Sequence, residues 1–213
     1  CTDADQIKGT RHELGQMTGA AHFTFHDFSL DMTVFYHNQS WYCAWTEKVS
    51  VEKKISNLYL AKLKSPNELE SQQVLLSSPD YDWERTGFWV NEGPAFIEHG
   101  KQVYRTYSAS ETGACYCVGM LSARKDADLL DPQVWIKERH PILKTDWEKG
   151  LIGPGHNSFT KLEDGKHDIM VFHARNYDEI DGNPLYDPNR HTYYLQIAWD
   201  QNEKPIFEYQ ASN

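Results

Sequence analysis

The feature that most constrains this chain is a β-hairpin pattern that recurs about every sixty residues. Three segments align, and each has a strand that carries a phenylalanine, then a polar turn, then a second strand. They are LDMTVFYHNQSWYCAWTE (30–47), NEGPAFIEHGKQVYRTYSAS (91–110) and GHNSFTKLEDGKHDIMVFHAR (155–175). Aligning the phenylalanines gives spacings of 61 and 63 residues between Phe35, Phe96 and Phe159. Self-similarity at such a period is typical of repeat architectures.

Each hairpin is followed by further alternating runs, so the repeated unit has about four strands. The third strand is expected at 57–63, 115–123 and 192–199, and a fourth at 72–76 and 133–137. Long amphipathic helical stretches are missing, and turn residues bound the runs. Four-stranded units of one period are typical of a β-propeller, with a stacked β-sandwich as the alternative. We therefore predict an all-β fold in which residues 1–213 belong to one domain.

The number of units predicts that this propeller extends beyond three blades. A propeller closes with at least four blades, yet three periods use nearly all of the 213 residues. Residues 1–29 lack a hairpin, and HFTFHDF (22–28) alternates like a single strand from a preceding blade. We expect the chain to supply about three and a half blades, and an N-terminal segment or partner chain to complete the ring.

Charge and hydropathy exclude two classes of partner. The formal net charge is −10, whereas binding to nucleic acid depends on clustered Lys and Arg. No apolar run approaches the roughly 18 to 20 residues of a membrane-spanning helix. We therefore expect neither nucleic acid nor a membrane as a partner. Aromatic residues are 13% of the chain, and their flat faces suit sugar rings as well as an ordinary β core.

The repeat also predicts where functional residues gather. The first strand of every propeller blade lies nearest the axis, so residues at equal phase converge on one mouth. Counting back four residues from the aligned phenylalanines gives Asp31, Glu92, and Gly155 beside His156. Singly, each can be a turn residue or a core histidine. Together they favour a functional site, because carboxylates at a buried axis are costly to stability.

Paired carboxylates predict glycoside hydrolysis, in which one carboxylic acid protonates the leaving oxygen and a carboxylate activates water or attacks the sugar. The charge of Asp31 can keep Glu92 protonated near neutral pH. Arg175, which ends the third hairpin, is expected to face the mouth and contact sugar hydroxyls or a carboxylate, with a surface ion pair as the alternative. Trp83 and Trp89 precede Glu92 and are candidate stacking faces for the substrate.

Four motifs carry a resemblance to a known family: SLDMTVF (29–35), DWERTGFWVNEGPAF (82–96), GPGHNSF (153–159) and HARNYDEIDGNPLYDPNRHT (173–192). Over essentially its whole length the sequence resembles family 43 glycoside hydrolases, which are five-bladed inverting arabinofuranosidases, arabinanases and xylosidases. The last motif is long and specific, and it is similar to that of exo-α-1,5-L-arabinofuranosidases.

The resemblance implies roles for the axial residues. Glu92 would be the general acid, and Asp31 would tune its pKa and orient it. The family's general base, an Asp near the start of the first blade, matches no segment here and is expected from the N-terminal segment. His156 matches the position that holds an axial cation with waters, so a structural calcium is possible, although a hard cation prefers oxygen ligands and no cofactor is required. Asn157 beside it is a candidate substrate-binding residue.

The expected function is therefore release of terminal α-L-arabinofuranose from arabinan or arabino-oligosaccharides, with inversion, by a secreted enzyme. The alternatives within enzymes are a β-xylosidase or an arabinoxylan-debranching enzyme, which would share the acid and differ in the pocket. A propeller that binds sugar without cutting it is the alternative from another class. A cytoplasmic location is the alternative to secretion.

Overall fold

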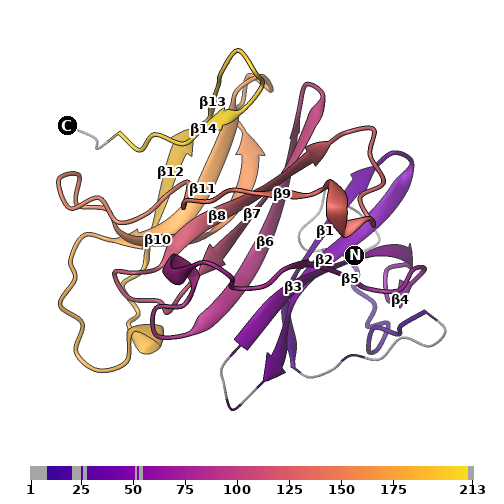
Figure 1. Cartoon of the computed structure of the whole chain (residues 1–213), viewed down its shortest axis with the longest axis horizontal. Helices are drawn as coiled ribbons and strands as arrows, with labels where there is room; N and C mark the ends of the chain where they lie inside the picture. Colours follow the sequence, from indigo (N-terminus) through magenta and orange to yellow (C-terminus); the bar gives the residue numbers. More distant parts are fainter. Residues whose placement is uncertain (1–8, 21–24, 26–27, 51, 53–54, 211–213) are drawn as a thin grey trace.

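The computed structural model describes residues 9–20, 25, 28–50, 52 and 55–210 (Figure 1). These residues form antiparallel sheets that follow one another across the molecule. Helical structure in this part of the chain is confined to three short 3-10 turns, η1 (Asp82–Glu84), η2 (Pro132–Val134) and η3 (Pro184–Tyr186). No helix in these described ranges is long and apolar enough to cross a membrane. The all-β prediction is confirmed.

Three successive groups of strands form three blades (Figure 1). The first blade comprises β1 (Ser29–His37), β2 (Ser40–Ser50), β3 (Ile55–Ser65), β4 (Glu68–Leu69) and β5 (Val74–Ser77). The second comprises β6 (Trp89–His99), β7 (Gln102–Ala109), β8 (Cys117–Arg124) and β9 (Ile136–Lys137). The third comprises β10 (Ile152–Lys161), β11 (Asp168–Arg175) and β12 (His191–Gln196). A short parallel pairing of β3 with β6 joins the first two blades.

The third blade differs from the predicted four-stranded unit. Its predicted third strand ends early, and the next residues form β13 (Ala198–Trp199), which pairs with β14 (Pro205–Ile206) in a separate ribbon. This ribbon packs on the second blade, where the indole of Trp199 stacks on the imidazole of His99 with 3.8 Å between ring centroids. The expectation of about four strands in each unit is therefore wrong for the third, whose sheet has three strands.

Tight turns define the first two hairpins. Asn38 and Gln39 connect β1 to β2 with φ angles of 43° and 60°, and Gly100 begins the equivalent turn between β6 and β7 with φ of 54°. Positive φ at these positions gives the turn a twist that matches the flanking strands. The polar turns expected from the sequence therefore lie where the hairpins reverse.

The strand register corrects the sequence alignment by one residue. His37 pairs with Ser40 and His99 pairs with Gln102, so equivalent positions are 62 residues apart in the first two blades. Phe35 and Phe96 therefore do not hold the same place. They lie on facing sides of neighbouring blades instead, and their rings stack with centroids 3.8 Å apart.

A β-bulge interrupts each inner strand at the same position. The register shifts between Leu30 and Thr33, between Glu92 and Ala95, and between Gly155 and Ser158. Within each bulge one residue has positive φ, namely Asp31 (57°), Gly93 (57°) and His156 (49°). Positive φ is uncommon for residues other than glycine, and a bulge re-aims the side chains beside it. These bulges position the candidate site.

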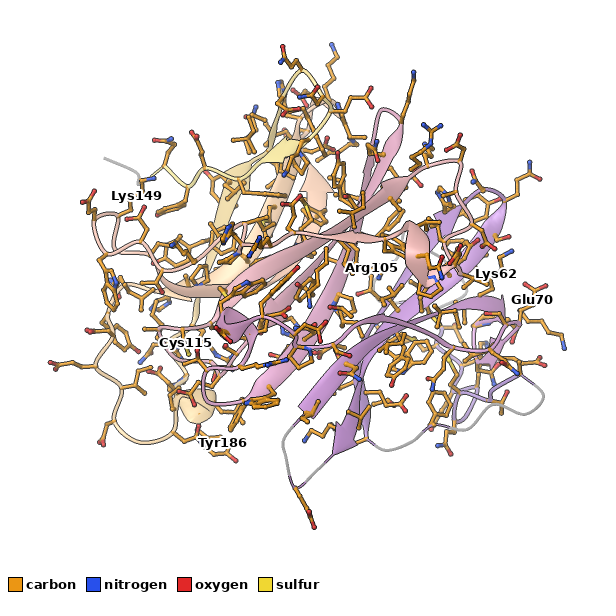
Figure 2. All side chains as sticks on the ribbon, viewed as in Figure 1. Lys62, Glu70, Arg105, Cys115, Lys149 and Tyr186 are labelled. Atoms are coloured by element: carbon orange, nitrogen blue, oxygen red, sulfur yellow. The ribbon has the colours of Figure 1, made fainter. Side chains whose placement is uncertain are left out.

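The apolar core lies between the blades. One buried cluster joins the first and second blades, and a second cluster joins the second and third. Arg105 is fully buried in the first of these layers, with its guanidinium carbon 4.7 Å from the ring centroid of Phe35 (Figure 2). Burial of each large apolar side chain contributes about 1.5 to 3 kcal/mol, so blade-to-blade packing is a main source of stability.

The described residues cover only part of the side of the first blade that faces away from the second. Met17 and Phe25 pack against its buried cluster. Farther along the same blade, Val34 is 43% exposed and Trp41 is 54% exposed. The single strand predicted at 22–28 lies largely outside the described residues. The backbone of Thr18, by contrast, pairs with the first blade at Asn67 and Leu69.

Candidate active site

The three inner strands bring Asp31, Glu92 and His156 to one pocket, as the repeat predicts. The backbone N–H of Gly93 donates to Asp31 Oδ2 at 3.1 Å, which ties the first bulge to the second. His156 Nε2 lies 3.7 Å from Asp31 Oδ1, which ties the first bulge to the third. The side chains of Asp31 and Glu92 therefore lie at the same end of their strands.

The pocket has a volume of about 530 Å³ and draws its walls from all three blades. Its lining combines the bulged strands with the β7–β8 connection, β11 and the loop before β12. The lining residues are Leu30, Asp31, Glu92, Thr112, His156, His173, Leu185, Asp187, Pro188 and Arg190. A concave site with a few convergent polar groups of both charges is the usual form of a small-ligand site.

The pKa of Glu92 is raised, and burial of its carboxyl is the largest cause. The negative charge of Asp31 raises that pKa further. Three groups act in the opposite direction, namely the hydroxyl of Tyr116 and the positive charges of His156 and Arg190. Because the net direction is upward, Glu92 keeps its proton to higher pH than an exposed glutamate. A carboxylic acid of this kind can donate a proton to a leaving group.

Arg175 corrects one expectation, because it does not face the mouth. The side chain is fully buried, and its guanidinium donates to the carbonyl oxygens of Thr112 at 2.7 Å and Pro184 at 2.9 Å. Its Nε lies 3.4 Å from Asp187 Oδ2, and the hydroxyl of Tyr177 donates to the same carboxylate at 2.8 Å. Arg175 thus fixes the loop that forms one wall of the pocket and has no exposed surface for a sugar.

The two tryptophans and the asparagine also lie outside the pocket lining. Trp83 is partly buried against the core cluster between the first two blades, and its indole N–H donates to the carbonyl oxygen of Arg139 at 3.0 Å. Asn157 is only 5% exposed, and substrate-binding roles for Trp83 and Asn157 stay predictions. Trp89 is 43% exposed at the start of β6, and a substrate-stacking role for it stays a prediction.

Sequence reasoning missed three polar residues at the site. Tyr116 donates its hydroxyl to Glu92 Oε1 at 2.6 Å. His173 and Arg190 line the pocket, and burial together with the charge of Arg190 lowers the pKa of His173 to about 3. That imidazole is therefore neutral, with one donor and one acceptor for hydroxyl groups. His173 and Arg190 both fall within the motif at 173–192, so that motif was the available signal.

A calcium ion is implied by the family resemblance, but the donor set does not form a calcium cage. Calcium takes six to eight oxygen ligands. His156 offers a nitrogen and is 44% exposed, and the nearest carboxylate belongs to Asp31. The described part of the chain has no group of three or more His, Cys, Asp or Glu side chains placed to hold a metal ion. Calcium at His156 stays a prediction.

Comparison with known proteins places this site in a family. The family model "Glycosyl hydrolases family 43" matches residues 1–205. The chain is 44% identical over 204 residues to an extracellular exo-α-(1→5)-L-arabinofuranosidase of Streptomyces avermitilis, covering 96% of this chain and 42% of that protein. It is 43% identical to α-L-arabinofuranosidase 43 of Humicola insolens, covering 84% of this chain and 38% of that protein.

A solved structure supports the same placement. The α-L-arabinofuranosidase of Lactobacillus brevis matches 92% of this chain and 59% of its own chain, with a TM-score of 0.87 and 43% identity. The chain therefore spans less than two thirds of the length of each of these relatives. The matched positions include all three inner strands because the family model runs through nearly the whole sequence. The chain belongs to family 43 of the glycosyl hydrolases.

Proposed function

We propose that the full-length protein containing this chain releases terminal α-L-arabinofuranose from arabinan or arabino-oligosaccharides with inversion. The observation that carries the proposal is Glu92, a carboxyl with a raised pKa beside Asp31 in the axial pocket of a family 43 chain. The relatives named exo-α-(1→5)-L-arabinofuranosidases support the substrate class. Both are named extracellular, which supports secretion. No cofactor is required by this chemistry.

The proposed reaction needs one acid and one base. Glu92 donates its proton to the glycosidic oxygen as the bond to the anomeric carbon breaks. A water molecule attacks that carbon from the opposite face and gives its proton to the base, so the product has the inverted configuration. The neutral imidazole of His173 and the guanidinium of Arg190 are placed to hydrogen-bond the sugar hydroxyls.

The base is proposed to come from a segment that precedes this chain. Among the carboxylates that line the pocket, Glu92 is the acid, and Asp31 raises its pKa. Asp187 contacts Arg175 and Tyr177. A hydrogen bond from the backbone N–H of Asn189 is the main cause that lowers the pKa of Asp187, and the contacts with Tyr177 and Arg175 lower it further. The base should lie about 6.5 to 9.5 Å from Glu92, which leaves room for the attacking water.

The stereochemistry of the product tests the proposed reaction. The full-length protein is incubated with α-1,5-linked arabino-oligosaccharides, and ¹H NMR follows the first anomer that forms. We expect L-arabinose released singly, with the β-anomer appearing first. An α-anomer first would overturn the inverting mechanism. Xylose released from xylo-oligosaccharides in place of arabinose would favour a β-xylosidase, and binding without hydrolysis would favour a sugar-binding propeller.

The completing segment is proposed to cover the open side of the first blade, where Val34 and Trp41 are exposed. If it does, Trp41→Lys in the full-length protein buries a charge and removes an apolar contact. We expect a loss of about 2 to 4 kcal/mol in the free energy of unfolding, measured by denaturant titration. Trp147→Lys is the matched control, since Trp147 is 60% exposed in a turn and its change should stay within about 0.5 kcal/mol. Equal, small effects would contradict a covering segment.

A further inference from the structure

We propose that Tyr116 is a positioning residue that holds Glu92 by one oxygen, so that the transferable proton resides on the other. The proposal rests on the proposed function, because it assigns Glu92 the role of acid. It goes further by naming the group that orients that acid and the oxygen that reacts. Tyr116 lies in the connection between β7 and β8, outside the periodic part of the fold.

The contact between the two side chains is direct. The hydroxyl of Tyr116 donates to Glu92 Oε1 with 2.6 Å between the oxygens, a length typical of a hydrogen bond to a carboxylate. Tyr116 is 1% exposed, so water does not compete for this bond. Oε1 is thereby occupied by a donor, and Oε2 is the oxygen free to carry a proton for the glycosidic bond.

The ring of Tyr116 is locked in place by its neighbours. An added Cβ on Gly155 would lie 2.1 Å from the ring, so the ring rests directly against the backbone of the third bulge. The imidazole of His173 stacks on the phenol with 5.5 Å between centroids and 6° between the planes. A side chain held by packing in this way positions its hydrogen-bond partner without losing further conformational freedom.

The phenol also stays a donor at all working pH values. Burial raises the pKa of Tyr116 well above its ordinary value, and the negative charge of Glu92 raises it further. A neutral hydroxyl that donates to a carboxylate stabilises the ionised form of that carboxylate. Tyr116 therefore opposes Asp31, since Tyr116 lowers the pKa of Glu92 and Asp31 raises it.

Within the described part of the chain, charged groups from the first and third blades act on Glu92 beside Tyr116. Asp31 comes from β1, His156 from β10, and Arg190 from the loop before β12, and each acts on the carboxyl through its charge. His173 and Asp187 also line the pocket. Of the groups that act on Glu92, Tyr116 is the one whose direct hydrogen bond to the carboxyl is described. Its removal should therefore change both the orientation and the pKa of the acid.

The test is Tyr116→Phe in the full-length protein, which keeps the ring and removes the hydroxyl. We expect kcat on arabino-oligosaccharides to fall roughly ten- to hundredfold while KM changes little, because only proton transfer is impaired. The alkaline limb of the pH profile should move to higher pH, because the lost donor no longer favours the carboxylate. A ¹³C NMR titration of the Glu92 carboxyl, assigned by its disappearance in Glu92→Gln, should show the same upward direction.

Tyr107→Phe is the matched control. Tyr107 is also fully buried and donates to a buried carboxylate, Glu84 Oε1, at 2.8 Å, but neither residue lines the pocket. This variant should lose stability without moving the pH limb. An unchanged Glu92 titration in folded Tyr116→Phe would overturn the proposal. The NMR readout needs no turnover, so a failure of the arabinofuranosidase assignment would appear separately, as a wild-type protein without activity.

Discussion

Glu92→Gln in the full-length protein is expected to lower kcat on unactivated arabino-oligosaccharides by about 100- to 10,000-fold. The loss should be far smaller on a p-nitrophenyl arabinofuranoside, because p-nitrophenolate leaves without a proton. The amide of Gln fills the same space and keeps an oxygen for the hydroxyl of Tyr116, so the change removes the proton and little else. Steady-state assays on both substrates measure the ratio of the two losses.

Glu98→Gln is the control for this experiment. Glu98 lies on the same strand, β6, and its carboxylate pairs with Lys125 and His37 at the opposite end from the pocket. The same chemical change at this position should leave the ratio of activities on the two substrates at its wild-type value. Equal losses on both substrates for Glu92→Gln would show that Glu92 is not the proton donor, and the sugar-binding alternative would then gain support.

The blades could be predicted from the sequence because their determinants are local. Alternating strands and polar turns recur at a near-constant period, and the structure has hairpins at all three predicted places. The register was missed by one residue because the alignment was anchored on Phe35 and Phe96, which face each other across two blades. The hairpin turns after His37 and His99 were the better anchor, since a turn fixes the register of its strands.

The site residues that could be predicted lie on the periodic strands, and most of those that were missed lie on connections between strands. Asp31, Glu92 and His156 lie at the bulges of periodic strands, so counting along the repeat brought them together, although the register places Asp31 level with Gly93 and not with Glu92. Tyr116 and Arg190 come from connections between strands, and the path of a connection does not follow the period. The sequence pattern also did not predict which charged side chains are buried, as Arg175 illustrates. Its charge favoured the pocket mouth, whereas the carbonyl groups around it hold it in the interior.

Asp31→Asn is expected to move the alkaline limb of the pH profile to lower pH. The charge of Asp31 raises the pKa of Glu92, so its removal lowers that pKa and the acid loses its proton earlier as the pH rises. When the assay pH lies above the pKa of the acid, kcat/KM falls about tenfold for each pH unit between them. The direction is opposite to that expected for Tyr116→Phe, which distinguishes the two residues in one assay.

Asn is the informative replacement because it preserves the local structure. Asp31 has a φ of 57°, a conformation that Asn also tolerates, and an amide oxygen can still accept the Gly93 N–H. Asp31→Ala would instead strain the bulge and lose that bond, so its effects on stability and rate would be mixed. Asp178→Asn, at an exposed position, is the control for net charge and should leave the limb unchanged. A limb that stays in place for Asp31→Asn, with wild-type stability, would mean that Asp31 does not set the proton affinity of Glu92.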